Sequence, residues 1–153
     1  MRLMWQRIIG VLILIGLAGC ANLVQPGASP LASPLSTPTG VILQYQRTGG
    51  IGGFDETWVI EADGRVTHTG RGAGADRQLT PDQVAQLLRA IRAAEMASLD
   101  ESYIPQNTCC DRFAHILTMT LDGQTKTVST LDGSPDEPAA LTDLLATLNN
   151  LLK

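Results

Sequence analysis

Residues 111–123 read DRFAHILTMTLDG, and they contain the clearest strand pattern of the chain. Apolar and polar side chains alternate along it, which is typical of a strand with one buried face. The Asp122-Gly123 pair at its end is a strong signal for a tight hairpin turn. We therefore expect a strand over Asp111–Leu121 that turns back into a second strand over Gln124–Thr130. The residues that share the predicted buried face are Phe113, His115, Leu117, Met119 and Leu121.

The segment after this hairpin predicts a helix. Residues 132–135 read DGSP, a combination that ends a strand. From Pro138 to Leu152 the leucines recur at helical spacing, so one side of the helix is expected to be buried. The leucines on that side are Leu141, Leu144, Leu145, Leu148, Leu151 and Leu152.

A second helix is predicted upstream, where residues 80–83 read TPDQ. Thr80 is a good N-cap, Pro81 suits the first helical position, and Gln83 can close a capping box. We expect this helix to end near Ala94–Met96 and to be flanked by a polar loop over residues 71–78 and a connecting loop over residues 98–108. Its buried side is expected to hold Val84, Leu87, Leu88 and Ile91.

Three strands are expected before this helix. Val41–Arg47 alternates in polarity, a glycine-rich loop follows over Thr48–Phe54, and Glu56–Ala62 is the second strand. The Asp63-Gly64 turn leads into a third strand over Arg65–Gly70. The order β-β-β-α-β-β-α predicts an α+β domain, in which an antiparallel sheet is covered on one face by two helices.

The N-terminus reads MRLMWQRIIGVLILIGLAGC and predicts a bacterial lipoprotein signal peptide over residues 1–19. Arg2 and Arg7 precede the apolar run Ile8–Leu17, which is shorter than the ~20 residues that cross a bilayer. The sequence LAGC that ends at Cys20 matches the lipobox, so we expect cleavage before Cys20 and attachment of a diacylglycerol and a further acyl chain such as palmitate. Two or more acyl chains anchor a protein stably. The alternative is an uncleaved N-terminal membrane helix.

Residues 20–40 predict a tether between the lipidated cysteine and a folded domain over residues 41–153. Four prolines separated by Ser, Ala and Thr lie in this segment, and it has no periodic apolar face. The predicted location is the bacterial cell envelope, with the domain held at a membrane and facing away from the cytoplasm. The four prolines are Pro26, Pro30, Pro34 and Pro38.

The charge balance disfavours nucleic acid as a partner. The chain has 11 basic and 15 acidic residues and a pI of about 5.0. Loss of Arg2 and Arg7 with the signal peptide leaves nine basic residues, so the mature chain carries a formal charge of −6. Nucleic-acid binding needs a basic surface instead.

The sequence indicates no enzyme, cofactor, metal site or small-molecule ligand. It has two histidines and none of the common catalytic or phosphate-binding motifs. We expect His115 to face the layer between sheet and helices, and His68 to lie on a solvated strand face. Neighbouring acids in a strand point to opposite faces, so solvated turns and helix N-termini explain the acidic pairs better than a catalytic dyad does. These pairs are Asp55 with Glu56, Asp100 with Glu101, and Asp136 with Glu137.

Cys109 and Cys110 are the only thiols left once Cys20 is lipidated. In an oxidising compartment, neighbouring cysteines can form a vicinal disulfide, remain as thiols, or pair between chains. A structural kink before the following strand is the favoured interpretation, because no Lys or His lies nearby to lower a thiol pKa. A redox switch or a metal-binding thiolate is the alternative.

The loop over residues 49–54 reads GGIGGF and has four glycines in its first five positions. Such a loop permits unusual backbone angles and close approach to a partner. The sequence leaves two interpretations open: a loop that presents Ile51 and Phe54 for binding, or a simple turn with Phe54 packed into the core. The candidate binding residues are Arg47, Gly49, Gly50, Ile51, Gly52, Gly53 and Phe54.

Several of these segments together resemble the emfourin-like family of small proteins that inhibit thermolysin-like metalloproteases such as protealysin. The resemblance covers nearly all of residues 43–152 and rests on YQRTGGIGGF at 45–54, LTPDQ at 79–83, DRFAHILTMTLDG at 111–123 and the closing leucine-rich helix. It implies a compact α/β inhibitor domain without catalytic activity. The lipoprotein signal, the tether and the cysteine pair depart from the family pattern, and His115 stands where the family has Tyr.

The leading hypothesis is therefore a lipid-anchored, non-enzymatic domain that binds protein and inhibits a secreted metalloprotease. One alternative is an interaction or scaffold lipoprotein of the envelope without inhibitory activity. Another is a thiol-based redox sensor that uses Cys109 and Cys110.

Overall fold

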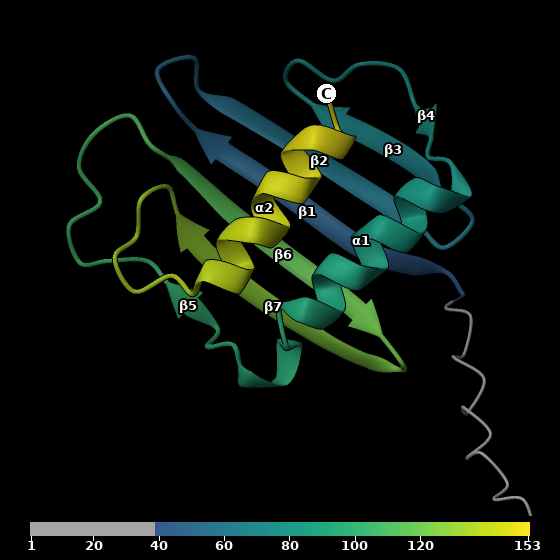
Figure 1. Ribbon diagram of the computed structural model, residues 1–153. Helices are drawn as coiled ribbons and strands as arrows, with labels where there is room; N and C mark the ends of the chain where they lie inside the picture. The colour runs from purple at the N-terminus through teal and green to yellow at the C-terminus, as the bar shows by residue number, and fades with distance from the viewer. Residues whose placement is uncertain (1–38) are drawn as a thin grey trace, which may run out of the picture. The chain divides into compact units, whose positions relative to one another are not determined.

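The fold is given by a computed structural model that describes residues 39–153, and it is built around a seven-stranded sheet (Figure 1). The predicted signal peptide, Cys20 and most of the predicted tether lie outside the described residues. None of the described helices is long and apolar enough to cross a membrane. The elements are β1 (Val41–Gly49), β2 (Phe54–Glu61), β3 (Arg65–Gly70), β4 (Arg77–Gln78), α1 (Pro81–Ala93), a 3₁₀ turn (Met96–Ser98), β5 (Ser102–Tyr103), β6 (Phe113–Leu121), β7 (Gln124–Leu131) and α2 (Ala139–Leu151).

The sheet has the strand order β4-β3-β2-β1-β6-β7-β5, with β1 in the middle. The long strands pair antiparallel, but β5 pairs parallel to β7, so the sheet is mixed and the expected purely antiparallel sheet is wrong. Both β4 and β5 lie in segments that we expected to be loops. Each is only two residues long, and a strand that short has no alternation that the sequence could display.

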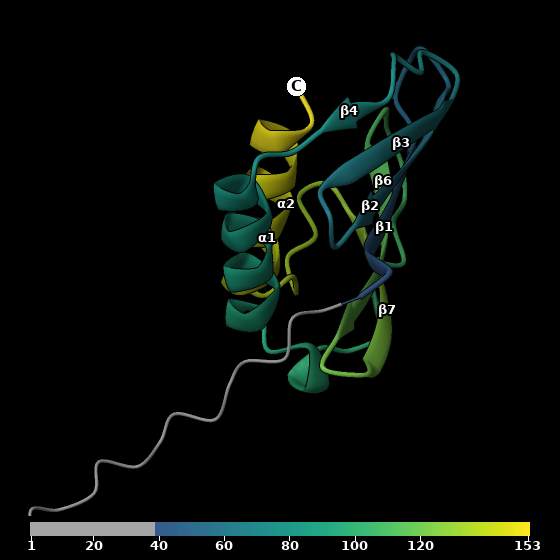
Figure 2. The same ribbon diagram turned by 90° about the vertical axis from the view of Figure 1, so that its right-hand side faces the viewer.

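The predicted helices are confirmed, and both cover the same face of the sheet (Figure 2). The capping box at the start of α1 is present in full. The backbone N–H of Gln83 donates to Thr80 Oγ1, and the backbone N–H of Thr80 donates to Gln83 Oε1. The Asp122-Gly123 turn also forms as expected, with positive φ at both residues (51° and 78°), which suits a tight hairpin between twisted strands.

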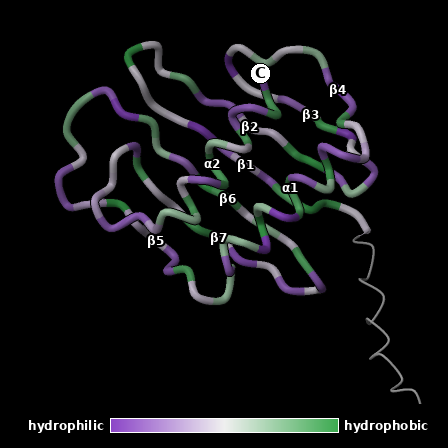
Figure 3. Tube along the Cα trace, in the orientation of Figure 1, coloured by the Kyte–Doolittle hydropathy of each residue, from purple (hydrophilic) through white to green (hydrophobic). Residues whose placement is uncertain are grey.

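The hydrophobic core fills the layer between the sheet and the helices. Alternate strand residues face the helices, and hydrophilic and hydrophobic positions interchange along the strands (Figure 3). The predicted leucine stripe of α2 is buried, except that Leu152 is only partly so. The most deeply buried core side chains are Ile42, Leu43, Tyr45, Ile60, Val66, Leu87, Ile91, Leu117, Met119, Leu141, Leu144 and Leu148.

The chain enters β1 at one end of the sheet, and the β1–β2 loop lies at the opposite end. β1 has nine residues and spans ~30 Å at ~3.3 Å per residue. Gly40, just before β1, accepts a hydrogen bond from the N–H of Ala62 beside the β2–β3 turn. The β1–β2 loop lies at the other end, next to the segments that lead out of β3 and into β6 (Figure 1).

The capping box makes a testable contribution to stability. Thr80→Ala should lower the free energy of unfolding by about 1 kcal/mol, because the N–H of Gln83 loses its acceptor. Thr147→Ala is the matched control, since the Thr147 hydroxyl donates to the Asp143 carbonyl within α2 and alanine is the better helix former. Urea denaturation of both variants measures the difference; equal losses would contradict the capping role of Thr80.

Candidate functional site

The β1–β2 loop is held from two sides and presents one apolar side chain to solvent. The N–H of Gly53 donates to the Gly50 carbonyl at 3.0 Å, which closes a turn within the loop. On one side, the N–H of Gly50 donates to the Arg112 carbonyl at 3.3 Å. On the other, Arg71 Nη1 donates to the Gly52 carbonyl at 3.1 Å. Ile51, between these contacts, is 89% exposed.

Two glycines of the loop are required by close approach as well as by backbone angle. Gly49 has φ 107°, and a Cβ there would lie 2.5 Å from the Arg112 carbonyl oxygen. Gly50 has φ 67°, and a Cβ there would lie 2.8 Å from Phe113 Cζ. A side chain at either position would push the loop away from the start of β6.

The loop rests on a small aromatic platform. Phe54 is 38% exposed, and its ring lies 5.8 Å from the ring of Phe113, centroid to centroid. The expectation that Phe54 packs into the core is therefore wrong, whereas the choice between a binding loop and a simple turn stays open. The Arg47 guanidinium lies 5.0 Å from the Phe113 centroid, 5.8 Å from that of Phe54 and 5.4 Å from that of Trp58. Arg47 thus makes cation–π contacts with both rings of the platform and with Trp58.

Arg47 is paired with a buried carboxylate. Its Nε and Nη2 atoms donate to Glu56 Oε2 at 3.1 and 2.5 Å, across the β1–β2 pair. Glu56 is only 5% exposed, so its expected place in solvent is wrong. The prediction that Asp55 and Glu56 point to opposite faces is confirmed, because Asp55 is exposed. Loss of the guanidinium would leave this buried carboxylate without its cation, so the contact ties the two strands together next to the loop.

Four aromatic rings form a row across four adjacent strands. The rings of His68 and Trp58 stack at 4.4 Å, those of Trp58 and Tyr45 at 5.2 Å, and those of Tyr45 and His115 at 5.8 Å. All four side chains face the helices. The expectation that His68 lies on the solvated face is therefore wrong, because His68 is in phase with the buried Val66.

His115 links this row to the loop after β7. The Tyr45 hydroxyl is 2.8 Å from His115 Nδ1, and His115 Nε2 is 2.7 Å from Asp132 Oδ1. A neutral imidazole with its proton on Nε2 satisfies both contacts, with the Tyr45 hydroxyl as donor to Nδ1. Burial raises the pKa of Tyr45 to about 12, which keeps that hydroxyl protonated. The predicted placement of His115 in the layer between sheet and helices is confirmed.

A cavity of about 250 Å³ lies between the row of aromatic rings and the end of α2. The N–H of Gly74 donates to His68 Nδ1 at 3.0 Å, so the proton of a neutral His68 ring is on Nε2. His68 Nε2 lies 3.6 Å from Glu56 Oε1, which is beyond hydrogen-bond distance. The lining residues are Tyr45, Arg47, Glu56, Trp58, His68, Asn149, Leu152 and Lys153.

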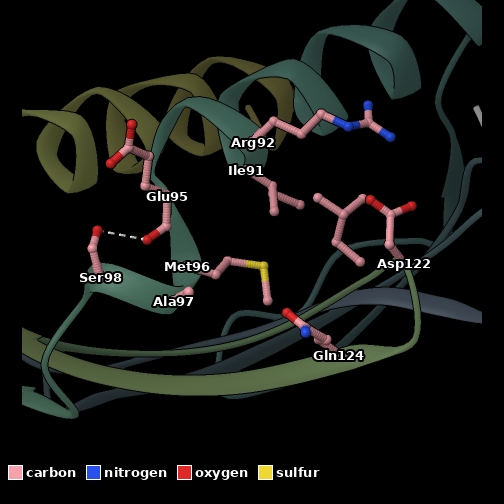
Figure 4. A pocket seen from close by; sticks show the side chains of 9 residues that line it. Ile91, Arg92, Glu95, Met96, Ala97, Ser98, Asp122 and Gln124 are labelled. Carbon is pink, nitrogen blue, oxygen red and sulfur yellow. Dashed lines mark hydrogen bonds between the residues drawn. The ribbon is translucent and has the colours of Figure 1, made fainter. Parts of the chain in front are cut away.

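A second cavity, of about 340 Å³, lies where α1 ends above the β6–β7 hairpin (Figure 4). The Ser98 hydroxyl donates to the Glu95 carbonyl at its rim, at 2.8 Å. Within residues 39–153, no three His, Cys, Asp or Glu side chains gather in a way that could hold a metal ion. The residues that line this cavity are Ile91, Arg92, Glu95, Met96, Ala97, Ser98, Leu121, Asp122 and Gln124.

Cys109 and Cys110 are exposed free cysteines on the segment that leads into β6. Their Sγ atoms are 2.7 Å apart, and Cys110 has φ 81°. The hydrogen bond with Cys109 raises the pKa of Cys110. The Arg112 guanidinium organises this segment by donating to the carbonyls of Asn107 at 2.6 Å, Cys109 at 3.2 Å and Asp132 at 3.2 Å. The vicinal disulfide stays a prediction.

The candidate binding residues lie together at one end of the sheet, but they have different roles. Ile51 and Phe54 are accessible, the glycines shape the loop, and Arg47 supports it from below. Sequence reasoning missed most of the residues that support the loop. Side chains alternate between the two faces of a strand, so those on strands could have been assigned to the helix-facing side from their spacing to apolar neighbours. Glu56, for example, is in phase with Trp58 and Ile60, so it had to face the helices. The missed residues are Tyr45, Glu56, Trp58, His68, Arg71, Arg112 and Asp132.

Comparison with protein-family models and with curated protein sequences gives no match for this chain.

The tyrosine–histidine contact predicts a pH dependence of stability. Below pH 10 Tyr45 is protonated in the folded and unfolded chain alike, so its contribution to stability is fully present. As the pH rises from 10 towards its folded pKa of about 12, the unfolded chain loses the proton first, and the free energy of unfolding should fall by roughly 2 kcal/mol. Urea denaturation between pH 8 and 11.5 measures this loss.

Tyr45→Phe isolates the effect. At pH 8 this variant should be about 1–3 kcal/mol less stable than the wild type, because His115 Nδ1 stays buried without its donor. Above pH 10 the difference in the free energy of unfolding between the two proteins should narrow. The wild type loses stability as Tyr45 ionises in the unfolded chain, whereas phenylalanine does not ionise. A gap that stays constant up to pH 11.5 would show that another group titrates.

Proposed function

We propose that this chain is a lipid-anchored, non-enzymatic protein of the bacterial cell envelope whose folded domain inhibits a thermolysin-like metalloprotease by binding it. The observation that carries the proposal is Ile51, which is 89% exposed on a loop whose backbone is fixed at three points. An isolated apolar side chain on a fixed loop is a good anchor for a pocket in a partner. The resemblance to the emfourin-like family points to the same class of partner.

The proposed mechanism is occlusion of the protease cleft. Hydrogen bonds from Gly53 to Gly50 and from Arg71 to Gly52 order the loop before binding, so little conformational entropy remains to be lost. Ile51, at the tip of the turn, then fills an apolar pocket on the primed side of the cleft. Phe54 extends the apolar contact at the edge.

The position of the loop suits an anchored inhibitor. Cys20 and the tether lead into β1 at Val41, whereas the loop follows β1 at Gly49. The length of β1 therefore separates the loop from the point where the tether joins by ~30 Å. A membrane-attached copy would present Ile51 away from that point, towards secreted enzymes.

The geometry gives less support to a thiol-based function. A reactive cysteine needs a lowered pKa, because the thiolate is the nucleophile. The pKa of Cys110 is raised instead by its contact with Cys109. Arg112, the nearest cation, directs its guanidinium to backbone carbonyls.

Ile51→Asp tests the loop. In titrations of a thermolysin-like protease with the full chain, this variant should need at least tenfold more protein for half-inhibition, because a charge cannot enter an apolar pocket without desolvation. Val41→Asp is the matched control: Val41 is also exposed, at 43%, but lies at the opposite end of β1.

Three results of this titration decide between the hypotheses. Loss with Ile51→Asp and not with Val41→Asp supports occlusion by the loop. Equal inhibition by Ile51→Asp and the wild type removes the loop from the mechanism. No inhibition by the wild-type chain at micromolar excess contradicts the inhibitor function and favours an envelope scaffold.

Cys20→Ser tests the anchor separately. The variant lacks the thiol that accepts the diacylglycerol, so we expect the chain to lose its acyl chains and its detergent-phase partitioning. Mass spectrometry of the N-terminal peptide and phase separation in Triton X-114 measure both effects, with Cys109→Ser as the control. A Cys20→Ser chain that still carries lipid would contradict the proposed attachment site.

A further inference from the structure

The sheet face that the helices leave uncovered has a centre without charge. Outward-facing residues line up across β3, β2, β1, β6 and β7 in two complete rows, and all ten are uncharged. Figure 2 shows that no helix lies on this side of the sheet. The first row is Thr67, Val59, Gln44, Thr118 and Thr127; the second is Thr69, Thr57, Gln46, Ile116 and Ser129. We call these ten residues the neutral face.

The neutral face is unusual for this chain. All 15 acidic residues and nine basic residues lie in the described part of the sequence, yet none falls in either row. The surrounding charges sit at its margins. Asp55 lies towards the β1–β2 loop, and the Glu61–Arg65 ion pair towards the other end. At the two sheet edges, the Asp76 carboxylate accepts from the N–H of His68 on β3, and the Glu101 carbonyl accepts from the N–H of Ser129 on β7. Depletion of charge is the compositional mark of the centre of a protein interface.

We propose that two copies of this chain pair through their neutral faces, sheet against sheet. The described residues carry a net charge of −6, so most other surfaces would bring like charges together when two copies meet. The ten residues of the neutral face bring no charge of their own to such a contact. A two-fold arrangement also lets the same ten residues serve both copies.

The side chains of the neutral face suit such packing. Eight of the ten are Thr, Ser, Val or Ile, which are compact enough for sheets to stack about 10 Å apart. The two larger residues, Gln44 and Gln46, lie on β1 in the middle of the sheet. A glutamine amide is both donor and acceptor, so it can pair with the same residue of a second copy. Ile116, 38% exposed, supplies an apolar centre.

The available area sets the expected strength of the dimer. The neutral face spans five strands that lie about 4.8 Å apart. Together with the uncharged residues next to the two rows along the strands, it offers a contact area of roughly 500 Å² per copy. Two copies would bury roughly 1,000 Å², which is the lower end for a specific interface. A weak, concentration-dependent dimer is therefore expected. It requires neither the lipid anchor nor protease binding.

Cross-linking of the full chain in its native membrane tests the proposal. In a Cys109→Ser, Cys110→Ser background, Gln44→Cys should give a covalent dimer with a bismaleimide that spans about 10 Å. Adding Ile116→Lys should reduce the yield at least tenfold, because each copy brings a charge to the centre of the contact. Thr127→Lys on β7 is a second, independent variant with the same expected direction. Gln86→Cys, on the solvent side of α1, and Gln86→Lys are the matched controls.

Each outcome bears on the proposal. A dimer from Gln44→Cys that Ile116→Lys and Thr127→Lys abolish, and that Gln86→Lys leaves unchanged, supports it. No dimer from Gln44→Cys, or a dimer that both lysine variants leave intact, overturns it. Cross-linking of Gln44→Cys to a different protein overturns the choice of a second copy. Thermal unfolding of the lysine variants, whose positions face solvent, verifies that they fold.

Discussion

The ion pair between Arg47 and Glu56 is the contact on which the rest of the loop end depends. It places the Glu56 carboxylate out of water, where the partly exposed Arg47 guanidinium is its ion-pair partner. The pair joins Arg47, near the end of β1, to Glu56, near the start of β2, so it fixes both stems of the β1–β2 loop. The same guanidinium lies beside the rings of Phe54, Phe113 and Trp58, which are the base on which the loop rests.

Much of this fold could be predicted from local patterns, and the failures have physical reasons. The β6–β7 hairpin and the start of α1 are encoded within a dozen residues each, as Asp122-Gly123 and Thr80 with Gln83 demonstrate. The two-residue strand β5 owes its existence to β7, which is far from it in sequence. Such pairing leaves no mark on local composition.

The site was predictable in part. The glycines and Ile51 mark the loop in the sequence, but its supports come from five separate segments. His68, Trp58 and Tyr45 lie side by side only because of the strand register, and Arg71 reaches Gly52 from the end of β3. Strand phase reveals which of these side chains face the helices. It cannot reveal which of them meet, because register is a property of the assembled sheet.

The central position of β1 has a mechanical consequence. β1 is hydrogen-bonded along its length to β2 on one side and to β6 on the other, and the chain enters it at Val41. A pull on the polypeptide ahead of Val41 acts along the strand axis. Both ladders are then loaded in shear, so many hydrogen bonds must yield together instead of opening one after another. The domain would consequently resist tension from its N-terminal side better than the same sheet pulled from an edge strand.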